Sequence, residues 1–340
     1  MIKKALITGV LGQDGAYLAN FLLSKGYCVY GGVNHSSLEK TQRLQALGIQ
    51  DKISYIPFDL TDSLNIEAVI NEGQFDEIYN LAAKSVVVAS WDQPVQISKV
   101  NALGTIYLLD SINRFSKQSR FYQASTSEMF GLTQENVRTE KTPFYPTTPY
   151  AVAKLFAHNM TANYRETFGI HASSGILFNH ESPLRGAEFV TKKITTQLAE
   201  IVLGRRTRIE LGNLNSKKDW GYAKEYVVGM WKMLQQEQPD DYILATGQSH
   251  TVRNFVEHAA SELDLDIEWE GEGLREIGIN RKNNKILVSV NPDYYRPEEV
   301  DVKIANAKKA AEKLDWNAST NVRELAKIMV EFDLNRLKLL

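Results

Sequence analysis

The segment Thr8-Gly9-Val10-Leu11-Gly12-Gln13-Asp14-Gly15 follows the apolar run 5–8 and carries three glycines at a spacing of three residues. The run before it is typical of a buried strand, and the residues after it predict a helix that ends near Lys25, with Gly26 following. Glycines in such a turn let the backbone approach a pyrophosphate, and the helix N-terminus adds partial positive charge. The segment therefore predicts a dinucleotide-binding turn rather than a plain strand-to-helix connection, with contacts at Gly9, Gly12, Gln13, Asp14 and Gly15.

Short apolar runs continue to alternate with longer helical stretches up to about residue 178. This alternation is typical of a parallel sheet that is covered by helices on both faces. Ligands of such sheets bind outside the carboxyl ends of the strands, so functional residues are expected in the loops that follow them. We therefore expect an α/β fold with a Rossmann-like, doubly wound parallel sheet. The predicted strands are residues 5–8, 29–33, 53–58, 77–81, 121–125 and 172–178.

The pattern is less regular beyond residue 178, with predicted helices at 188–203 and 252–263 and a polar, glycine-containing connection at 270–278. The economical interpretation is a smaller, mixed α/β region that binds the substrate. We expect residues 1–178 to form the dinucleotide-binding domain, joined by later returns of the chain, and residues 179–340 to form mainly the substrate-binding region.

Composition excludes several classes of function. The 340 residues are 43% hydrophobic and 24% charged, and 39 Lys and Arg against 41 Asp and Glu give a formal net charge of −2. No basic surplus is present to neutralise nucleic-acid phosphates or an anionic membrane. The single cysteine, Cys28, cannot form an internal disulfide, which suits a reducing cytoplasm, and no run of about 18 apolar residues predicts a membrane span. We expect a cytoplasmic protein without nucleic-acid or membrane partners and without a metal site.

The end of the second predicted strand distinguishes NAD from NADP. A carboxylate there binds the ribose 2′-hydroxyl of NAD, whereas a cation binds the 2′-phosphate of NADP. The segment Val33-Asn34-His35-Ser36-Ser37 has no acid, and Lys40 and Arg43 follow it. These groups favour NADP over NAD, although a solvated helix face explains the two cations equally well. Further cofactor contacts are expected at Ser36 and Arg43, at Asp59 and Leu60 beside the adenine ring, and at Leu81, Ala83 and Ser85.

The segment Tyr150-Ala151-Val152-Ala153-Lys154 places a phenol and an ammonium four residues apart, and therefore on one face of a helix. Thr148 can cap this helix, Pro149 fits its first position, and Gly169 follows its end. A tyrosine is a poor base at neutral pH, but a nearby ammonium and a cationic nicotinamide ring favour its phenolate. Such pairs are common by chance, and the position after a glycine-loop sheet is what indicates a catalytic role for Tyr150 and Lys154.

The segment Ser125-Thr126-Ser127-Glu128 follows the fifth predicted strand, so its side chains are expected at the ligand-binding edge of the sheet. The Thr126 hydroxyl can hold a substrate oxygen that is being oxidised. Glu128 is more informative, because simple alcohol oxidation needs no second base, whereas removing a proton next to a new ketone and expelling a hydroxyl does. The alternative for Glu128 is a carboxylate that stabilises a helix N-terminus.

Taken together, these motifs resemble those of the extended short-chain dehydrogenases/reductases. More narrowly, and over nearly the whole chain, the sequence resembles the GDP-mannose 4,6-dehydratase family. The glycine loop and the Tyr/Lys pair mark only the superfamily, whereas the later blocks are more specific. The matching blocks are 9–15, 123–131, Phe178-Asn179-His180-Glu181-Ser182-Pro183 with Arg185-Gly186, Leu211-Gly212-Asn213, Asp219-Trp220-Gly221 and Tyr295-Arg296-Pro297-Glu298-Glu299-Val300-Asp301.

The resemblance implies a lyase that oxidises C4 of a GDP-sugar with NADP⁺, eliminates water across C5 and C6, and returns the hydride to C6. It implies that Tyr150 takes the C4 hydroxyl proton, that Lys154 anchors the nicotinamide ribose, and that Glu128 and Thr126 serve the elimination. It also implies cofactor contacts at His180 and Arg185. The substrate contacts that it implies are Ser85, Thr126, Glu128, Asn179, Lys193, Lys218, Arg296 and Glu299.

The chain also departs from the family pattern. Many members carry two arginines where this chain has Asn34-His35, in a loop that binds the 2′-phosphate and helps to join subunit pairs, so NADP preference and the choice between homodimer and homotetramer stay open. Lys218 replaces a common arginine, and Gln96 replaces a frequent tyrosine near the cofactor. A related substrate such as a GDP-manno-heptose is therefore an alternative. Another is a nucleotide-sugar epimerase or 4-keto reductase, and a third is an NADP-binding module without turnover.

Overall fold

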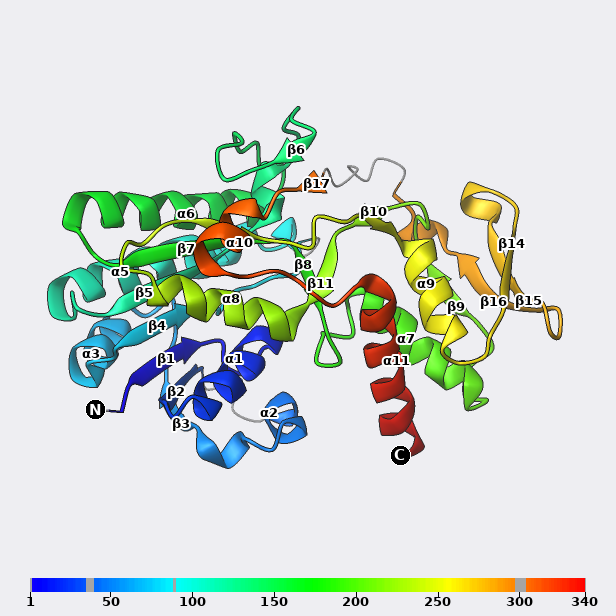
Figure 1. The fold of residues 1–340 in the computed structure, drawn as a ribbon, viewed down its shortest axis with the longest axis horizontal. Coiled ribbons are helices and arrows are strands. Elements are labelled where there is room, and N and C mark those ends of the chain that lie inside the picture. Colours follow the sequence, from blue (N-terminus) through cyan, green and yellow to red (C-terminus); the bar gives the residue numbers. More distant parts are fainter. Residues whose placement is uncertain (1, 35–39, 88–89, 297–303, 340) are drawn as a thin grey trace. The chain divides into compact units, whose positions relative to one another are not determined.

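The computed structural model describes residues 2–34, 40–87, 90–296 and 304–339, and its chain forms two compact units (Figure 1). The first unit comprises Met1–Phe178, Ala223–Leu244 and Asn306–Asn317. The second unit comprises Asn179–Tyr222, Ala245–Ala305 and Ala318–Leu340. The chain thus returns to the first unit twice after leaving it at residue 178.

The described part of the first unit contains a seven-stranded sheet in the order β12-β7-β5-β4-β1-β2-β3, in which all neighbours are parallel. The predicted doubly wound parallel sheet is confirmed, and each end of the six predicted strands agrees within one residue. The seventh strand, β12, was not predicted, because it is only three residues long and belongs to a later return of the chain. The strands are β1 (Lys4–Thr8), β2 (Cys28–Val33), β3 (Ser54–Pro57), β4 (Glu77–Asn80), β5 (Arg120–Thr126), β7 (Ala172–Leu177) and β12 (Tyr242–Leu244).

The helices of this unit form two packed groups, α1 with α8 and α10, and α3 with α5 and α6. In Figure 1, α6 and α8 flank the sheet. Helix α6 begins after the Thr148 cap and ends at Phe168, where Gly169 follows with a φ of +67°, as the sequence predicted. The other elements are α1 (Gln13–Ser24), α2 (Gln42–Ala46), η2 (Gln50–Lys52), α3 (Ser63–Gly73), α4 (Pro94–Ser98), η4 (Lys99–Leu103), α5 (Gly104–Phe115), η5 (Ser127–Phe130), β6 (Val137–Arg138), α6 (Pro149–Phe168), α8 (Ala223–Gln235) and α10 (Lys308–Leu314).

The core between the sheet and the α3–α5 layer is apolar, with Leu6, Ile78 and Phe121 from neighbouring strands all fully buried. Strands that are covered on both faces need such continuous apolar runs. Polar side chains are buried where the strands end, and they include Thr8, Asn80 and Thr126. The sheet therefore provides a rigid base with a polar edge at its carboxyl ends.

The second unit contains a four-stranded sheet in the order β14-β15-β16-β9, with α7, α9 and α11 packed together around a separate apolar core. The expectation of a connection at 270–278 was wrong at both ends, because residue 270 ends β14 and residues 277 and 278 begin β15. The elements are β8 (Asn179–Glu181), α7 (Val190–Val202), β9 (Ile209–Leu211), β10 (Lys217–Lys218), β11 (Trp220–Tyr222), β13 (His250–Thr251), α9 (Val252–Ser261), β14 (Ile267–Glu270), η6 (Gly273–Arg275), β15 (Ile277–Asn280), β16 (Lys285–Val290), η7 (Pro292–Tyr294), β17 (Ile304–Ala305) and α11 (Val322–Lys338).

Across the described residues, every helix is too short or too polar to traverse a lipid bilayer. Within the same ranges, His, Cys, Asp and Glu side chains do not gather in groups of three or more that could hold a metal ion.

Candidate active site

The glycine loop between β1 and α1 has the backbone geometry that the spacing predicted. Gly9 adopts a φ of +71°, and the Gly12 amide donates to its carbonyl oxygen at 2.9 Å. A Cβ on Gly9 would lie 2.8 Å from the backbone of Ala82, and a Cβ on Gly15 would lie 2.6 Å from Cα of Val10. The three glycines therefore let two backbone segments and a helix N-terminus come together, which leaves the first amides of α1 available to an anion.

Arg43, on α2, contacts the glycine loop. Its guanidinium donates to the Leu11 carbonyl oxygen at 3.1 Å from α2. This places a positive charge beside the glycine loop, where a dinucleotide phosphate is expected. Ser36, the other residue predicted for this part of the cofactor, lies outside the described residues.

The turn after β3 holds the two residues that were predicted to meet adenine. The Asp59 carboxylate accepts hydrogen bonds from the amide and the hydroxyl of Thr61, each at 2.8 Å. Leu60 is buried in the core, and Gly104 packs so closely against it that a Cβ there would lie 2.8 Å from Cβ of Leu60. Asp59 is therefore exposed at the sheet edge, whereas the Leu60 side chain packs inward.

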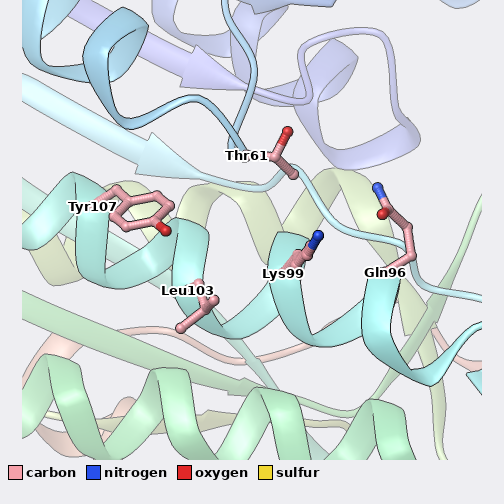
Figure 2. A pocket seen from close by; sticks show the side chains of 5 residues that line it. All are labelled: Thr61, Gln96, Lys99, Leu103 and Tyr107. Atoms are coloured by element: carbon pink, nitrogen blue, oxygen red, sulfur yellow. The ribbon is translucent and has the colours of Figure 1, made fainter.

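A pocket of about 340 Å³ lies beside this turn (Figure 2). In Figure 2 the Gln96 and Lys99 side chains point toward the segment that carries Thr61. The pocket thus has two polar groups on the α4 and η4 side and adjoins the Asp59 turn. Its lining residues are Thr61, Gln96, Lys99, Leu103 and Tyr107.

The segment after β4 is held by polar residues that the sequence analysis did not identify. The Thr8 hydroxyl donates to Asn80 and accepts from the amides of Leu81 and Ala82, each at 3.1 Å. Asn101 forms two hydrogen bonds to the backbone of Lys84, at 3.0 and 3.1 Å. Asn101 belongs to η4, a π-helical turn of the kind that is frequent at functional sites. Ala83, between these fixed points, is half-buried, and Ser85 is exposed at the end of the segment.

Thr126 and Glu128 form the polar end of β5. Thr126 is 9% exposed, and its Oγ1 caps η5 by accepting from the Glu128 amide at 3.2 Å. Because the oxygen acts as the acceptor, the hydroxyl hydrogen can be donated to a ligand. Glu128 is half-buried in the first turn of η5. The two residues that were predicted to serve one substrate are thus joined by the cap of one turn.

Tyr150 and Lys154 lie one turn apart on α6, and both are buried. The Lys154 ammonium donates to the Ala124 carbonyl oxygen at 2.9 Å, which joins α6 to β5 two residues before Thr126. Burial lowers the pKa of Lys154 to about 8, although the charge of Asp14 in the glycine loop acts in the opposite direction. The structure therefore brings the glycine loop, the end of β5 and the Tyr/Lys helix together within the first unit.

A chain of buried polar groups lies behind the end of β5. Ser125 Oγ is 3.1 Å from Nδ1 of His158, and Nε2 of His158 is 4.0 Å from the Asp241 carboxylate. Arg165 binds both oxygens of Asp241, at 2.9 and 2.8 Å. Burial lowers the pKa of His158, with the Asp241 charge opposing this shift. His158 is therefore best described as a neutral imidazole that holds Ser125 in place. Its spacing of four residues from Lys154 is the sequence signal that could have identified it.

In the second unit, the strand β8 carries two predicted ligand residues, Asn179 and His180, which are half-buried and buried. Arg185 was predicted to contact the cofactor, and it forms an ion pair with the buried Glu181 at 3.0 Å. Its guanidinium also stacks on the Phe189 ring at 3.5 Å. The planar face and position of this cation are thus fixed by its neighbours before any ligand binds.

A second group of predicted ligand residues gathers around Tyr294 in the same unit. The Lys193 ammonium lies 3.9 Å from the centre of the Tyr294 ring, and burial lowers the pKa of Lys193. Gly212 packs directly against the Tyr294 carbonyl oxygen, and the Asn213 amide donates to the Arg296 carbonyl at 3.3 Å. Lys193 therefore contacts the Tyr294 ring, and the 212–213 turn contacts the backbone of Tyr294 and Arg296. Glu299 lies outside the described residues.

Lys218 precedes a carboxylate with a structural role. Asp219 is 2% exposed and accepts from the Thr246 amide and hydroxyl and from the Gly247 amide, at 2.7 to 3.0 Å. Burial raises the pKa of Asp219, and these hydrogen bonds oppose the shift. Asp219 thus fixes the turn at residues 246–247, and Lys218 beside it is half-buried on β10.

Comparison with known proteins assigns the family. The family model described as GDP-mannose 4,6 dehydratase matches residues 6–329. A GDP-mannose 4,6-dehydratase of Sinorhizobium fredii is 50% identical over 343 residues, which cover 99% of this chain and 98% of that protein.

Solved structures agree on the fold. A dTDP-glucose 4,6-dehydratase from Bacillus anthracis in complex with NAD superposes with a TM-score of 0.81 at 18% identity, over 99% of this chain and 98% of the other. RMD from Pseudomonas aeruginosa complexed with NADPH gives a TM-score of 0.75 at 18% identity, over 98% of this chain and 100% of the other. The match to the family model over nearly the full length, together with the half-identical relative, shows that this chain belongs to the GDP-mannose 4,6-dehydratase family.

Proposed function

We propose that this protein is a GDP-mannose 4,6-dehydratase that recycles NADP within each turnover. The observation that carries the proposal is the arrangement at the end of β5, where Thr126 caps the turn η5 that carries Glu128 and Lys154 is hydrogen-bonded to Ala124. A Tyr/Lys pair suffices to oxidise an alcohol. The half-buried Glu128 adds the acid-base group that an elimination requires.

The residues of the first unit fit a dinucleotide. Side chains on Gly9 and Gly15 would collide with backbone atoms, so the turn stays open for a pyrophosphate. Arg43 beside the loop and the absence of an acid at 34–37 favour NADP over NAD. Proteins of this fold carry either one, since the structures from P. aeruginosa and B. anthracis contain NADPH and NAD. When bound, the nicotinamide supplies the acceptor and donor of two electrons.

The side chains of the first unit divide the proton transfers. Tyr150 takes the proton of the C4 hydroxyl as that carbon is oxidised, and the buried Lys154 ammonium stabilises the phenolate. Glu128 then takes the C5 proton, the bond between C6 and its hydroxyl oxygen breaks, and the same proton leaves with that hydroxyl as water. Thr126 donates a hydrogen bond to the sugar. C6 then takes back the hydride that left C4, and C5 takes the proton that Tyr150 holds. This gives GDP-4-keto-6-deoxymannose and regenerates the Tyr150 phenolate, with no net change in the cofactor.

The second unit carries residues that suit the rest of the substrate. The Lys193 ammonium lies against the Tyr294 ring, and Arg296 follows two residues later with its backbone carbonyl held by Asn213. A partly desolvated ammonium such as that of Lys193 favours an anionic ligand. We assign these two residues to the diphosphate. Asn179 and Lys218, with Glu299, complete the proposed GDP-sugar contacts. In this proposal the first unit binds mainly the dinucleotide and the second mainly the nucleotide sugar.

Exposed apolar side chains on the first unit support a homodimer. Val152 and Phe156 lie one turn apart on α6 and are 53% and 39% exposed. The neighbouring α4 and η4, which pack against α6, expose Val95 and Leu103. Isolated apolar residues are common on surfaces, but a group on adjoining helices is typical of an interface. Light scattering should give twice the chain mass, and Phe156→Glu should shift it toward the monomer. A mass of four chains would indicate a tetramer.

The decisive experiment is to incubate the purified protein with GDP-mannose and no added nicotinamide. The 4-keto product absorbs ultraviolet light in alkali, and mass spectrometry of nucleotides released from fresh protein identifies the retained cofactor. Dehydration of a GDP-manno-heptose in place of GDP-mannose would change the substrate. Release of NAD(H) alone would change the cofactor.

Two variants separate the proposal from its alternatives. Tyr150→Phe should abolish turnover while the cofactor still binds, and surviving activity would show that another group acts as the base. Glu128→Gln should slow elimination more than C4 oxidation. Equal slowing of both steps would contradict the role assigned to Glu128. A wild-type protein that interconverts or reduces a nucleotide sugar without eliminating water would favour an epimerase or reductase, and one that binds NADP without any turnover would favour a binding module.

A further inference from the structure

Tyr294 is an exposed aromatic residue of the second unit to which the proposed chemistry gives no role. Its side chain is 51% exposed, and the Lys193 ammonium lies over its ring, 3.9 Å from the centre. At this distance the electron-rich face of the ring attracts the cation. Across the described ranges, the Lys193 ammonium thus contacts an aromatic ring rather than a carboxylate.

The lysine that precedes Lys193 is held in the opposite way. The Lys192 ammonium forms an ion pair with the fully buried Asp333 at 2.5 Å and donates to the Pro183 carbonyl oxygen at 2.8 Å. Both lysines belong to the first turn of α7, which contains no acidic residue. The N-terminus of a helix attracts anions and repels cations. The fold therefore neutralises one of two adjacent charges and leaves the other available to an anion.

The carboxylate that influences Lys193 most is bound by other groups. Burial lowers the pKa of Lys193, and the charge of Glu210 opposes this shift. The Glu210 carboxylate accepts hydrogen bonds from Arg208 and from Asn291, each at 3.2 Å. An anionic ligand that reaches the Lys193 ammonium therefore does not have to displace Glu210 from it.

The backbone around Tyr294 fixes the place of its ring. Tyr294 ends η7, and its amide donates to the Asn291 carbonyl oxygen at 3.1 Å. The Asn291 amide in turn donates to the Leu211 carbonyl oxygen of β9 at 2.8 Å. A Cβ on Gly212 would lie only 2.3 Å from the Tyr294 carbonyl oxygen, so the two turns are in close contact. The ring is therefore in position before any ligand binds, which lowers the cost of ordering Lys193.

We propose that Tyr294 is a positioning residue for the substrate diphosphate, whose ring holds the Lys193 ammonium in place without neutralising its charge. This inference rests on the proposed function, which assigns Lys193 to that diphosphate. A carboxylate at the same place would also hold the ammonium, but it would compete with the diphosphate for it. The proposal differs from a direct contact between Tyr294 and the nucleoside, in which the ring would act without Lys193.

The test compares Tyr294→Leu, which removes the ring, with Tyr294→Phe, which keeps it. In calorimetric titrations we expect Tyr294→Leu to bind GDP about fivefold more weakly than the wild type, and Tyr294→Phe to stay within about twofold. Guanosine, which lacks the diphosphate, should bind to Tyr294→Leu and to the wild type with affinities within about twofold. With GDP-mannose, Tyr294→Leu should raise KM about fivefold and leave kcat within about twofold, because the diphosphate is bound equally in the ground state and the transition state.

A second comparison measures whether the effect passes through Lys193. In a Lys193→Met background, Tyr294→Leu should weaken GDP binding by less than about twofold, since the cation that the ring holds is absent. An equal loss in both backgrounds, or an equal loss for guanosine, would overturn the proposal and show that the ring contacts the nucleoside itself.

Thermal denaturation of each variant detects a folding defect. If Tyr294→Leu fails to fold, Tyr294→Gln replaces it, because glutamine suits a half-exposed position and also lacks a ring. A wild-type protein that does not dehydrate GDP-mannose would contradict the proposed function. A dehydrating wild type whose Tyr294→Leu variant binds GDP as tightly as it does would contradict only the role of Tyr294.

Discussion

Replacement of Gly15 by alanine tests why the glycine loop has its spacing. Gly15 is the third residue of α1, and alanine inside a helix is ordinarily more stable than glycine by about 1 kcal/mol. Here the new Cβ would lie 2.6 Å from Cα of Val10 and would overlap the Gly9 carbonyl oxygen. Since carbon atoms make favourable contacts at about 3.5–4.0 Å, the loop must move by about 1 Å. Both obstacles are backbone, so a change of side-chain rotamer cannot relieve them.

The expected energies follow from these two opposing effects. Overpacking of this kind costs about 1–3 kcal/mol, which offsets the gain in helix propensity and leaves the variant less stable than the wild type by up to about 2 kcal/mol. The effect on the cofactor should be larger, because the loop amides no longer point at the pyrophosphate. We expect NADPH to bind at least about tenfold more weakly, which corresponds to about 1.4 kcal/mol.

Calorimetric titration of nucleotide-free protein with NADPH, together with a thermal scan, measures both quantities. Gly26→Ala is the matched control: its φ of +80° makes alanine strained by about 1–2 kcal/mol, but no atom lies within 4 Å of the added Cβ. The control should lose stability and keep its NADPH affinity. A Gly15→Ala variant that is more stable than the wild type, or that binds NADPH equally well, would refute the argument from close backbone approach.

Three further predictions concern buried ionisable groups. Lys154→Met should be more stable than the wild type at pH 7 by on the order of 3 kcal/mol, because the pKa of about 8 reflects a desolvated ammonium. The same variant should lose turnover. An unchanged or lower melting temperature would contradict the expected gain in stability. Asp333→Asn should cost about 3–5 kcal/mol of unfolding free energy, since it leaves the buried Lys192 ammonium without its carboxylate, and chemical denaturation that shows no loss would exclude a buried ion pair. His158→Gln should reduce the loss of unfolding free energy that occurs as the pH is lowered. Burial lowers the pKa of His158 in the folded protein, so the unfolded chain binds more protons than the folded one as the pH falls through about 6.5. The slope of unfolding free energy against pH should therefore decrease by at most about 1.4 kcal/mol per pH unit in the variant. His171, His250 and His258, whose pKa values are also lowered, remain in both proteins, so an equal slope would mean that His158 is not kept neutral by the fold.

Local signals explain what the sequence analysis predicted correctly. The glycine turn, the Thr148 cap and the Gly169 end of α6 depend on residues within a few positions of each other, and all three are present in the structure. The same holds for the parallel strands, whose apolar runs are continuous. By contrast, β12 consists of Tyr242–Leu244 and is defined by its pairing with β7, far away in the sequence. A short strand of this kind carries no periodicity of its own.

The polar residues that support the site were missed for a related reason. Asn101 holds the Lys84 backbone, and Asn80 donates to Gln123 at 2.8 Å from the neighbouring strand. Each pairing joins residues that are distant in sequence, and an asparagine on a helix or strand usually indicates only a solvated position. Only the topology brings them together. Motifs in the sequence could propose groups for the chemistry, but could not identify the residues that hold those groups in place.

The buried Lys154 ammonium of the first unit connects stability with the proposed chemistry. Lys154 is almost fully buried beside β5, and its lowered pKa shows that the ligand-free protein stabilises its positive charge poorly. A negative charge that forms nearby is therefore stabilised more than it would be in water, since the desolvation of the cation has already occurred during folding. The Tyr150 phenolate is such a charge. In the proposed mechanism, the side chain that destabilises the folded protein also lowers the barrier to C4 oxidation, which is why Lys154→Met should gain stability and lose activity together.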